Sequence, residues 1–364
     1  MKKLISIVGA RPQFIKAAVV SRAIATLNEE SGNQLAESIV HTGQHFDPQM
    51  SRIFFEEMEI LDPAVHLGIA CLPHGAMTGR MIETIEEVLL ADKPSVVLVY
   101  GDTNTTLAAT VAASKLHVPI AHVEAGLRSF NRKMPEEINR VLTDHASDFL
   151  FAPTRVAADN LRREGFDERR IHCVGDVMYD ASLFYAQRAR RTSTIRKRLD
   201  LSSRKYVLAT IHRQENTDDP IRLQVIFEAF ARIARDTRVI LPLHPRTRSA
   251  LLKLPASIEP SRLLEIIEPV GYLDMVALEE HAVVIATDSG GVQKEAYFYG
   301  VPCVTLRDET EWVELVEIGA NVLAPPHNPE VIVDAITAAL ASSRRAKGNK
   351  LYGTGDEGEK IVGI

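Results

Sequence analysis

The chain is poor in cysteine, and the three cysteines that it has lie far apart in the sequence. Cys71, Cys173 and Cys303 form no C-x-x-C motif, and so few, widely spaced cysteines argue against a disulfide framework and against a structural zinc site. The H-E-x-x-H motif of zinc hydrolases is absent as well. We therefore expect no metal, and we expect a reducing compartment, the cytoplasm, as the location.

The sequence also lacks a long apolar run. Its first run, Leu4–Val8, is followed by Arg11 and Pro12, which end it too early for a signal peptide. No later stretch approaches the roughly 18 uninterrupted apolar residues that a membrane helix needs. Leu4–Val8 is better explained as a first buried strand, and no membrane partner is expected.

An excess of basic residues is missing too, because 42 Lys and Arg stand against 48 Asp and Glu, a net charge of −6. This balance argues against nucleic acid as a partner, since non-specific binding to phosphates needs a basic face. It leaves room for a local basic site that binds a small anion. A basic stretch at residues 188–198 has little apolar periodicity, and we interpret it as a solvated helix end and linker rather than a nucleic-acid patch.

What the chain does contain is a regular alternation of short apolar runs and longer periodic segments. At 364 residues, 46% of them hydrophobic, it is long enough for two domains. Apolar residues recur at helical spacing in one such segment, at Met77, Met81, Ile82, Ile85, Val88 and Leu89. The apolar runs predict strands at residues 4–8, 38–41, 95–100, 119–123, 149–152, 206–210, 239–243, 263–267, 282–286 and 301–306.

This alternation predicts the fold class: α/β, with two Rossmann-like parallel-sheet domains that face a cleft. We place the first domain at residues 1–172 and the second at 173–350, with the boundary near the basic stretch. Ligands of open parallel sheets bind at the carboxyl ends of the strands, so the residues that follow each strand are the candidates for function.

Charged side chains follow the strands of the first half. They are the acids Asp102, Glu124 and Glu136 and the bases Arg11, Lys16 and Arg128. Each acid also has a structural alternative: Asp102 can cap a helix, Glu136 suits the first turn of a helix, and Glu124, which is harder to explain so, could still be purely structural. Their coincidence at successive strand ends favours an acid/base site.

The strand ends of the second half offer histidines and a glycine-rich turn. His212 and Arg213 end one strand, and His244 ends the next. Ser289-Gly290-Gly291 opens a helix, where free N–H groups and the positive helix end suit a phosphate. Glu295 lies one turn later, placed either to bind a ribose diol or simply to be solvated on the helix surface.

One motif is rejected. Residues 353–358 read G-x-G-x-x-G, the dinucleotide-binding fingerprint, but no strand precedes them and only six residues follow. Without a βαβ unit the match has no structural basis, so NAD chemistry is disfavoured and no cofactor is expected.

These strand-end motifs resemble the non-hydrolysing UDP-N-acetylglucosamine 2-epimerases along essentially the whole chain. The motifs that carry the resemblance are 9–16 (GARPQFIK), 41–45 (HTGQH), 101–104 (GDTN), 122–126 (HVEAG), 135–140 (PEEINR) and 287–293 (TDSGGVQ). The resemblance implies a fold like that of the GT-B glycosyltransferases, with UDP held by the second domain and the segment 351–364 crossing back onto the first. It also implies a UDP-sugar as partner, a homodimer, and no cofactor.

The family inverts C2 of an N-acetylated sugar by eliminating UDP to give a 2-acetamidoglucal and adding it back with the proton on the other face. By resemblance, Asp102, Glu124, Glu136 and His212 are the catalytic residues. The substrate-binding residues are Arg11, Lys16, Arg128, Arg140, His244 and Trp312. The UDP-binding residues are Arg213, Val270, Ser289, Gly290, Gly291 and Glu295.

The chain departs from the family pattern at Gln13, where glutamate is usual, and at Trp312, where arginine is usual. We interpret both as changes on the sugar side of the site. Together with the surrounding motifs they resemble the branch that acts on UDP-2,3-diacetamido-2,3-dideoxy-glucuronate in O-antigen and lipopolysaccharide synthesis. Arg132 or Lys133 is then the expected contact for the substrate carboxylate. UDP-GlcNAc/UDP-ManNAc interconversion, a GT-B glycosyltransferase and a non-catalytic nucleotide-sugar sensor are the alternatives.

Overall fold

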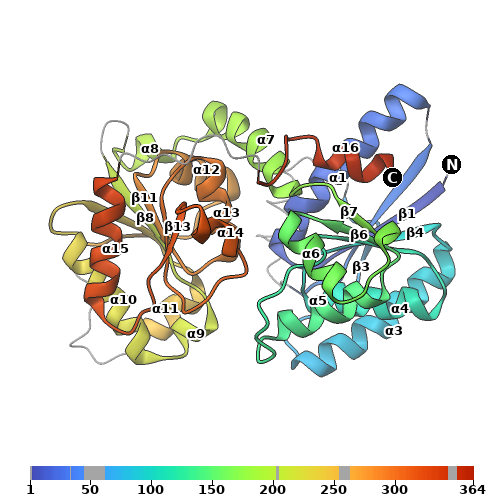
Figure 1. Ribbon diagram of the computed structural model, residues 1–364, viewed down its shortest axis with the longest axis horizontal. Coiled ribbons are helices and arrows are strands. Elements are labelled where there is room, and N and C mark those ends of the chain that lie inside the picture. Colours follow the sequence, from blue (N-terminus) through green and yellow to red (C-terminus); the bar gives the residue numbers. More distant parts are fainter. Residues whose placement is uncertain (1, 33, 45–61, 202–204, 254–262, 343–350) are drawn as a thin grey trace. The chain divides into compact units, whose positions relative to one another are not determined.

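The computed structural model describes residues 2–32, 34–44, 62–201, 205–253, 263–342 and 351–364. These fall into two compact units, Met1–Leu183 with Lys350–Ile364, and Phe184–Asn349. Each unit is a parallel sheet covered by helices on both faces (Figure 1). The predicted α/β class with two parallel-sheet domains is therefore confirmed.

The sheet of the first unit has seven strands in the order β3-β2-β1-β4-β5-β6-β7, all parallel. The strands are β1 (Lys2–Val8), β2 (Leu35–His41), β3 (Val65–His66), β4 (Val96–Tyr100), β5 (Ile120–Val123), β6 (Phe149–Ala152) and β7 (Ile171–Cys173). The helices of this part are α1 (Arg11–Ser31), α3 (His74–Asp92), α4 (Asn104–Lys115), α5 (Pro135–Ala146), α6 (Arg155–Arg163), the 3₁₀ turn η1 (Glu168–Arg170), α7 (Val177–Thr192) and α16 (Glu357–Gly363).

The sheet of the second unit has six parallel strands in the order β10-β9-β8-β11-β12-β13. They are β8 (Tyr206–Thr210), β9 (Arg238–Pro242), β10 (Glu265–Ile267), β11 (Val284–Thr287), β12 (Cys303–Thr305) and β13 (Asn321–Leu323). The helices are α8 (Ile195–Arg198), α9 (Gln214–Thr217), α10 (Pro220–Ile233), α11 (Pro245–Leu251), α12 (Tyr272–His281), α13 (Gly290–Phe298), α14 (Val313–Glu317) and α15 (Pro329–Ala341).

Apolar strands buried on both faces make the cores, as the sequence predicts. β8 is buried along its whole length, and β4 is buried from its second residue onward. The predicted helix is α3, whose Met77, Met81, Ile85 and Leu89 pack into the core of the first unit. Side chains from both sheet faces are thereby removed from water, and this burial is the main favourable contribution to folding.

Three strands were not predicted, namely β3, β7 and β13. Each has only two or three residues and mixes apolar with polar side chains. They lie at the edges of their sheets, where one side of the strand has no neighbour, so a continuous apolar sequence is not required there. The length of an edge strand depends on the neighbouring strand with which it pairs. That pairing cannot be read from the sequence of the edge strand itself.

The strand orders fix where ligands can bind. In the first sheet the chain order reverses direction between β1 and β4, and in the second between β8 and β11. Such switch points separate the loops of the two neighbouring strands and leave a crevice at the carboxyl ends. The loops concerned begin at Gly9 and Gly101 in one sheet and at Ile211 and Asp288 in the other.

The boundary between the units lies within α7, not at residues 172 and 173, where the sequence analysis placed it. The first turns of α7 stay with the first unit because the C-terminal segment holds them. Asp176 N–H donates to the Tyr352 carbonyl at 2.8 Å, and Gly358 N–H donates to Asp180 Oδ1 at 3.2 Å. α16 also packs on α1, with Gly358 so close to Val19 that a Cβ at position 358 would lie 2.8 Å from Val19 Cγ1. Figure 1 shows these two helices side by side.

The rejected glycine motif of residues 353–358 forms a turn around a carboxylate of its own. Glu357 is fully buried, and its oxygens accept hydrogen bonds from Thr354 N–H at 2.6 Å and Gly355 N–H at 2.9 Å. Gly353 and Gly355 adopt φ of 113° and 90°, a region that favours glycine. The two glycines are thus explained by the turn geometry.

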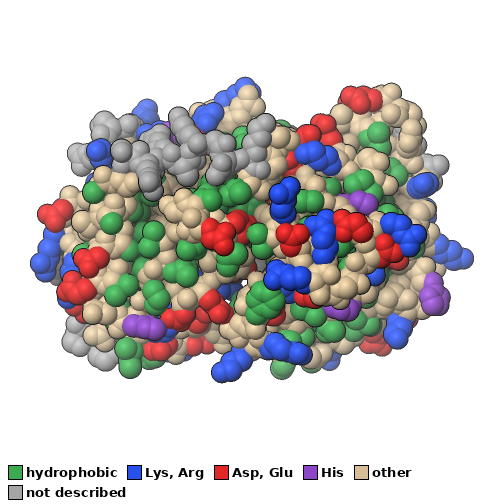
Figure 2. Space-filling model, viewed as in Figure 1, with side chains coloured by type: hydrophobic (Ala, Val, Ile, Leu, Met, Phe, Trp, Pro, Cys, Tyr) green, Lys and Arg blue, Asp and Glu red, His purple; other side chains and the backbone are tan. Residues whose placement is uncertain are grey.

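Within the described segments, no helix is long and apolar enough to cross a membrane. On the face drawn in Figure 2, Lys and Arg side chains are interspersed with Asp and Glu.

The contact between α7 and the C-terminal segment predicts a pH dependence. Burial and the neighbouring Glu357 carboxyl raise the pKa of Asp180 from 3.8 to about 8. A carboxyl whose pKa is raised on folding binds its proton more tightly in the folded state, so its contribution to stability falls as pH rises from about 4 to about 8. We expect Asp180→Asn to raise Tm relative to wild type at pH 8 by a few degrees, and less at pH 5, in thermal unfolding followed by circular dichroism.

Asp334→Asn removes an exposed carboxylate from α15 and serves as the control, with no pH-dependent difference expected. A loss of stability in Asp180→Asn that is equal at both pH values would contradict this account of the pair.

Candidate functional site

Glu124 and Lys16 form a buried ion pair at the switch point of the first sheet. Lys16 extends from the second turn of α1, and Glu124 follows β5 directly. Lys16 Nζ donates to Glu124 Oε2, and the two side chains are 7% and 10% exposed. Glu124 has a φ of 76°, which non-glycine residues seldom adopt and which is frequent at functional positions. The carboxylate also lies over Gly101, where a Cβ would come within 3.2 Å of Glu124 Oε2.

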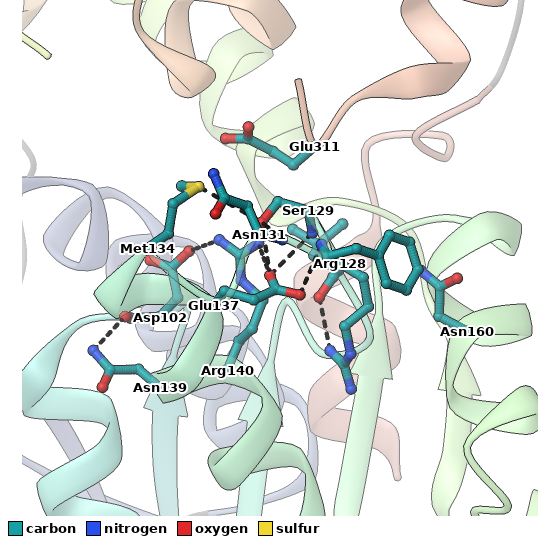
Figure 3. Close-up of polar contacts among 12 residues, drawn as sticks. Asp102, Arg128, Ser129, Asn131, Met134, Glu137, Asn139, Arg140, Asn160 and Glu311 are labelled. Carbon is teal, nitrogen blue, oxygen red and sulfur yellow. Dashed lines mark hydrogen bonds and ion pairs between the residues drawn. The ribbon is translucent and has the colours of Figure 1, made fainter. Parts of the chain in front are cut away.

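Asp102 is held from two sides, as Figure 3 shows. Its carboxylate accepts from Arg140 Nη2, and its carbonyl accepts from Asn139 Nδ2 at 3.0 Å. Arg140 and Asn139 are neighbours on α5 and both are buried. The carboxylate itself is 32% exposed, so it is fixed in direction while remaining accessible.

Glu136 and Glu137 begin α5 but have different environments. Glu136 is half-buried and, among the residues that the structure describes, has no ion-pair or hydrogen-bond partner. Glu137 is buried, accepts from Arg140 Nη1 at 3.0 Å, and takes hydrogen bonds from the backbone N–H groups of Ser129 and Phe130, each at 3.0 Å. Glu137 therefore anchors the loop before α5 (Figure 3), and Glu136 is left available for chemistry.

Behind these residues lies a fully buried charge cluster. His122 Nδ1 contacts Asp144 Oδ1 at 2.7 Å and Nε2 contacts the Gly101 carbonyl at 2.8 Å. Burial raises the pKa of Asp144, but hydrogen bonds and charge from His122 and Arg128 outweigh burial and lower that pKa below its usual value. His122 thus connects Asp144 to the backbone beside Asp102.

Arg128, which the sequence analysis placed among the substrate-binding residues, is engaged in this cluster by its whole guanidinium group. Its Nη1 donates to Asp144 Oδ2 at 2.7 Å, and its Nε and Nη2 form a two-point pair with Glu164 at 2.7 Å each. The Arg128 side chain is 1% exposed, and its charge is balanced by the buried Asp144 and the partly exposed Glu164. Such pairing is the condition for burying a charge at acceptable cost.

Gln13 is likewise a structural residue, contrary to the expectation that it faces the sugar. Its Oε1 accepts from the N–H groups of Gly9 and Ala10 at 2.8 and 3.0 Å. Its Nε2 donates to the Tyr100 carbonyl at 2.8 Å and to Thr106 Oγ1 at 2.9 Å. All four hydrogen-bonding positions of the amide are thus used at 1% exposure, and they join the loop after β1 to the end of β4.

Arg11, Asn104 and His74 are further polar residues of the first unit. Arg11 is the first residue of α1, and its side chain is not among those described. Sequence reasoning missed Asn104 and His74, which extend the polar row from Asn139. Asn139 Nδ2 donates to Asn104 Oδ1 at 3.2 Å, and Asn104 Nδ2 lies 3.0 Å from His74 Nδ1. A signal was available, because Asn104 follows Asp102 in the same strand-end motif.

In the second unit, Asp288 organises the loop after β8. This carboxylate is completely buried and accepts from His212 N–H at 3.1 Å, Arg213 N–H at 3.0 Å and Asn216 Nδ2 at 3.1 Å. The His212 ring is 36% exposed and lies 5.4 Å from the His244 ring. Asp288 thus links the two loops at the switch point of β8 and β11 and leaves the His212 ring accessible.

The helix start predicted to hold phosphate is α13. Ser289 caps it, with Oγ accepting from Val292 N–H at 3.5 Å. A Cβ at Gly291 would meet nothing closer than 3.9 Å, whereas a Cβ at Gly290 would lie 2.4 Å from Glu311 Oε1. The N-terminal end of α13 is therefore in contact with a carboxylate that the sequence analysis did not single out.

Glu295 and Val270, both expected to bind UDP, differ in burial. Glu295 is buried on α13, and Tyr272 Oη donates to its Oε1 at 3.2 Å. Burial and the Glu295 charge raise the pKa of Tyr272 well above its usual value, so the phenol is a donor at neutral pH. Val270 is half-buried just before the N-cap of α12. Glu295 thus lies on the buried side of α13, fixed by the Tyr272 phenol.

Trp312 is buried at 3% exposure. The ammonium of Lys294, a buried residue of α13, lies 4.1 Å from the centre of its ring, a cation–π contact. That Trp312 contacts substrate stays a prediction from the sequence.

No group of three or more His, Cys, Asp or Glu side chains that could hold a metal ion occurs in the described parts of the chain. His41 and His45 do stand at an H-x₃-H spacing. The His41 ring is stacked between Phe14 and His66, at 5.0 and 4.3 Å between centres, and His45 lies outside the described residues.

The sequence is similar to known proteins over its whole length. The family profile described as UDP-N-acetylglucosamine 2-epimerase matches residues 27–364. A UDP-2,3-diacetamido-2,3-dideoxy-D-glucuronate 2-epimerase of Pseudomonas aeruginosa is 54% identical over 364 residues, covering 99% of this chain and 98% of that protein. A UDP-N-acetylglucosamine 2-epimerase of Methanocaldococcus jannaschii is 45% identical, covering 100% and 98%.

Solved structures are similar too. A crystal structure of the Methanocaldococcus jannaschii UDP-GlcNAc 2-epimerase in complex with UDP-GlcNAc and UDP matches with a TM-score of 0.91 at 44% identity, covering 100% of this chain and 99% of that one. A Neisseria meningitidis UDP-GlcNAc 2-epimerase bound to UDP-GlcNAc matches with a TM-score of 0.87 at 30% identity, covering 99% and 98%. The expected GT-B-like fold class is confirmed by this likeness.

The hydrogen bonds of Gln13 predict the effect of restoring the family's glutamate. Gln13→Glu places a carboxylate oxygen against the Tyr100 carbonyl and removes two donors, which should lower the free energy of unfolding by about 1–3 kcal/mol. Urea unfolding measures this, with Gln34→Glu, an exposed position at the start of β2, as the control. Unchanged stability together with altered substrate selectivity would return Gln13 to a sugar-facing role.

Proposed function

Because the chain belongs to the UDP-N-acetylglucosamine 2-epimerase family, we propose that its substrate is UDP-2,3-diacetamido-2,3-dideoxy-glucuronate, which it converts to the manno epimer. The chain is a UDP-sugar 2-epimerase, an isomerase. The observation that carries the choice of substrate is the 54% identity to the Pseudomonas aeruginosa relative over the whole chain. The reaction itself is supported by carboxylates at the strand ends of one unit, and by a helix start with nearby arginines in the other.

The chemistry of the reaction explains why it needs both sets. The hydrogen at C2 is not next to a carbonyl, so its removal must be coupled to the departure of UDP from C1. The C2–H and C1–O bonds break, a C1–C2 double bond forms, the proton passes to an enzyme base, and UDP leaves with the electron pair. UDP then adds back to C1, and the proton is delivered to C2 on the opposite face, which gives the epimer. Two positions for proton transfer and a site that holds the leaving diphosphate are required.

Asp102, Glu124 and Glu136 are the groups proposed to move the proton. When Glu124 takes a proton, the ammonium of Lys16, only 7% exposed, loses its counter-charge. The protonated state of Glu124 is therefore unfavourable, and the proton is readily returned to the sugar. Arg140 stands in the same relation to Asp102. Glu136, without such a partner among the described residues, can hold or release a proton without breaking an ion pair.

His212, Arg213 and the start of α13 are proposed to bind the diphosphate. Arg213 Nη2 is 3.5 Å from where a Cβ of Gly290 would be, so a guanidinium and the positive end of a helix address the same place. Glu295 and Val270 are proposed to contact the ribose and uracil end of UDP. His244, next to His212, completes the exposed edge.

The choice among UDP-sugars rests on similarity to the Pseudomonas aeruginosa relative. The two sequence departures no longer support it, since Gln13 is structural and Trp312 is buried. Arg132 and Lys133 are exposed and, within the described segments, have no ion-pair partner, so both are available to the carboxylate of a uronate. UDP-GlcNAc/UDP-ManNAc interconversion is the second candidate, supported by the Methanocaldococcus jannaschii relative.

Two further expectations are proposals of the same kind. We propose that the enzyme is a homodimer and works in the cytoplasm. Cys71, Cys173 and Cys303 are free thiols in the structure, which a reducing compartment maintains.

One set of assays tests reaction and substrate together. Each UDP-sugar is incubated with the enzyme in D₂O without an acceptor, and deuterium at C2 is followed by NMR alongside kcat/KM. We expect deuterium to enter C2 with both sugars, with a higher kcat/KM for the diacetamido-uronate. A kcat/KM for UDP-GlcNAc equal to or above that of the uronate would reject the substrate, and absence of C2 exchange would reject the reaction.

A further inference from the structure

The N-terminal end of α13 already has an anion against it. Gly290 is the first residue of the helix, and a Cβ there would lie 2.4 Å from Oε1 and 3.4 Å from Cδ of Glu311. The carboxylate is therefore in close contact with the helix start, at the position that the proposed function assigns to a phosphate. A carboxylate and a phosphate oxygen are attracted to such a position by the same N–H groups and the same helix dipole.

Two guanidinium groups complete this environment. Arg307 Nη1 donates to Glu311 Oε2 at 2.9 Å, and Arg213 Nη2 lies 3.6 Å from Glu311 Oε1. Arg307 is 1% exposed and is held in place by its Nε bond to Glu215 Oε1 at 3.1 Å. Glu311, at 8% exposure, thus sits between two arginines and a helix N-terminus, as a bound anion would.

A diphosphate cannot join this arrangement without displacing the carboxylate. Glu215 pairs with Arg307, and the charge of the fully buried Asp288 also acts on Arg307. With Glu311 in place, its carboxylate occupies the position beside Gly290, so a further anion there would be repelled by the Glu311 charge. If Glu311 turns away, the guanidinium groups regain free donors.

We propose that Glu311 is an internal competitor of UDP, occupying the diphosphate position in the unliganded protein and leaving it when UDP binds. This inference rests on the proposed function, because it assumes that UDP binds at α13. The apparent affinity for UDP is then the intrinsic affinity multiplied by the fraction of molecules in which Glu311 has left the site. The return of Glu311 also gives the enzyme a way to release UDP, since the carboxylate restores the balance of charge around Arg307 as the nucleotide departs.

The sign of one mutational effect tests the inference. UDP is titrated calorimetrically into wild type, Glu311→Gln and Glu311→Ala. Removal of the competing charge should tighten UDP binding by about tenfold, the factor for a site blocked in nine of ten molecules, and should slow UDP dissociation in stopped-flow displacement. Most substitutions in a binding site weaken binding, so a gain in affinity is diagnostic.

Glu317→Gln is the matched control, since it removes the same charge from an exposed position on α14 and should leave UDP affinity unchanged. Unchanged or weaker UDP binding in both Glu311 variants would overturn the inference and make Glu311 a positioning residue for Arg213. Arg213→Ala tests the proposed function separately, because it should weaken UDP binding with or without Glu311. If Arg213→Ala binds UDP like wild type, the UDP site itself is assigned wrongly.

Discussion

Charge buried at the ends of parallel strands must be balanced, and most of the site follows from that requirement. In the first unit Lys16 balances Glu124, Arg140 bridges Asp102 and Glu137, and His122 and Arg128 balance Asp144 and Glu164. An unpaired ion at such burial would cost several kcal/mol, so removing one partner disturbs the others. Because the pairs join α1, α5 and α6 to the loops after β4 and β5, they also fix the direction of the reactive carboxylates. The charge network therefore supports the loops and orients the carboxylates that we propose to move the proton.

In the second unit the arginines proposed to bind UDP must likewise be balanced by carboxylates. Its arginines are needed for a ligand, and in the protein alone they are balanced by Glu215, Asp288 and Glu311. Asp288 is permanently engaged by backbone N–H groups, and Glu215 holds Arg307 from the exposed side. Glu311 alone contacts the helix start that a phosphate would use. In the proposed mechanism the first unit interrupts an ion pair only while a carboxylate holds the proton, whereas the second unit would exchange the internal anion Glu311 for the diphosphate.

The sequence was sufficient for the fold class and for which loops bring charged side chains to the switch points, and insufficient for the contacts that individual side chains make there. Apolar runs and helical spacing are local properties, so β1, β4, β8 and α3 could be predicted, while β3, β7 and β13 depend on a neighbouring strand. Asp102 and Lys16 lie at the strand ends where they were expected. The position of Arg128 depends on Glu164, 36 residues away, and that of Gln13 on Tyr100 and Thr106. Glu311 was overlooked because nothing in its own segment indicates that it meets Gly290. Contacts between distant segments decide whether a polar residue faces a ligand or the protein interior.

The central claim is that the carboxylates of the first unit move the proton while the second unit alone holds UDP. The most direct measurement compares C2 deuterium exchange and calorimetric UDP affinity in Asp102→Asn, Glu124→Gln and Glu136→Gln, with Lys16→Met/Glu124→Gln added because it leaves no unpaired ammonium. The account predicts that exchange falls by about 10²-fold or more, the usual scale for losing an acid/base group, while the Kd for UDP stays at its wild-type value. Exchange at the wild-type rate in all of these variants, or a loss of UDP affinity that parallels the loss of exchange, would contradict it.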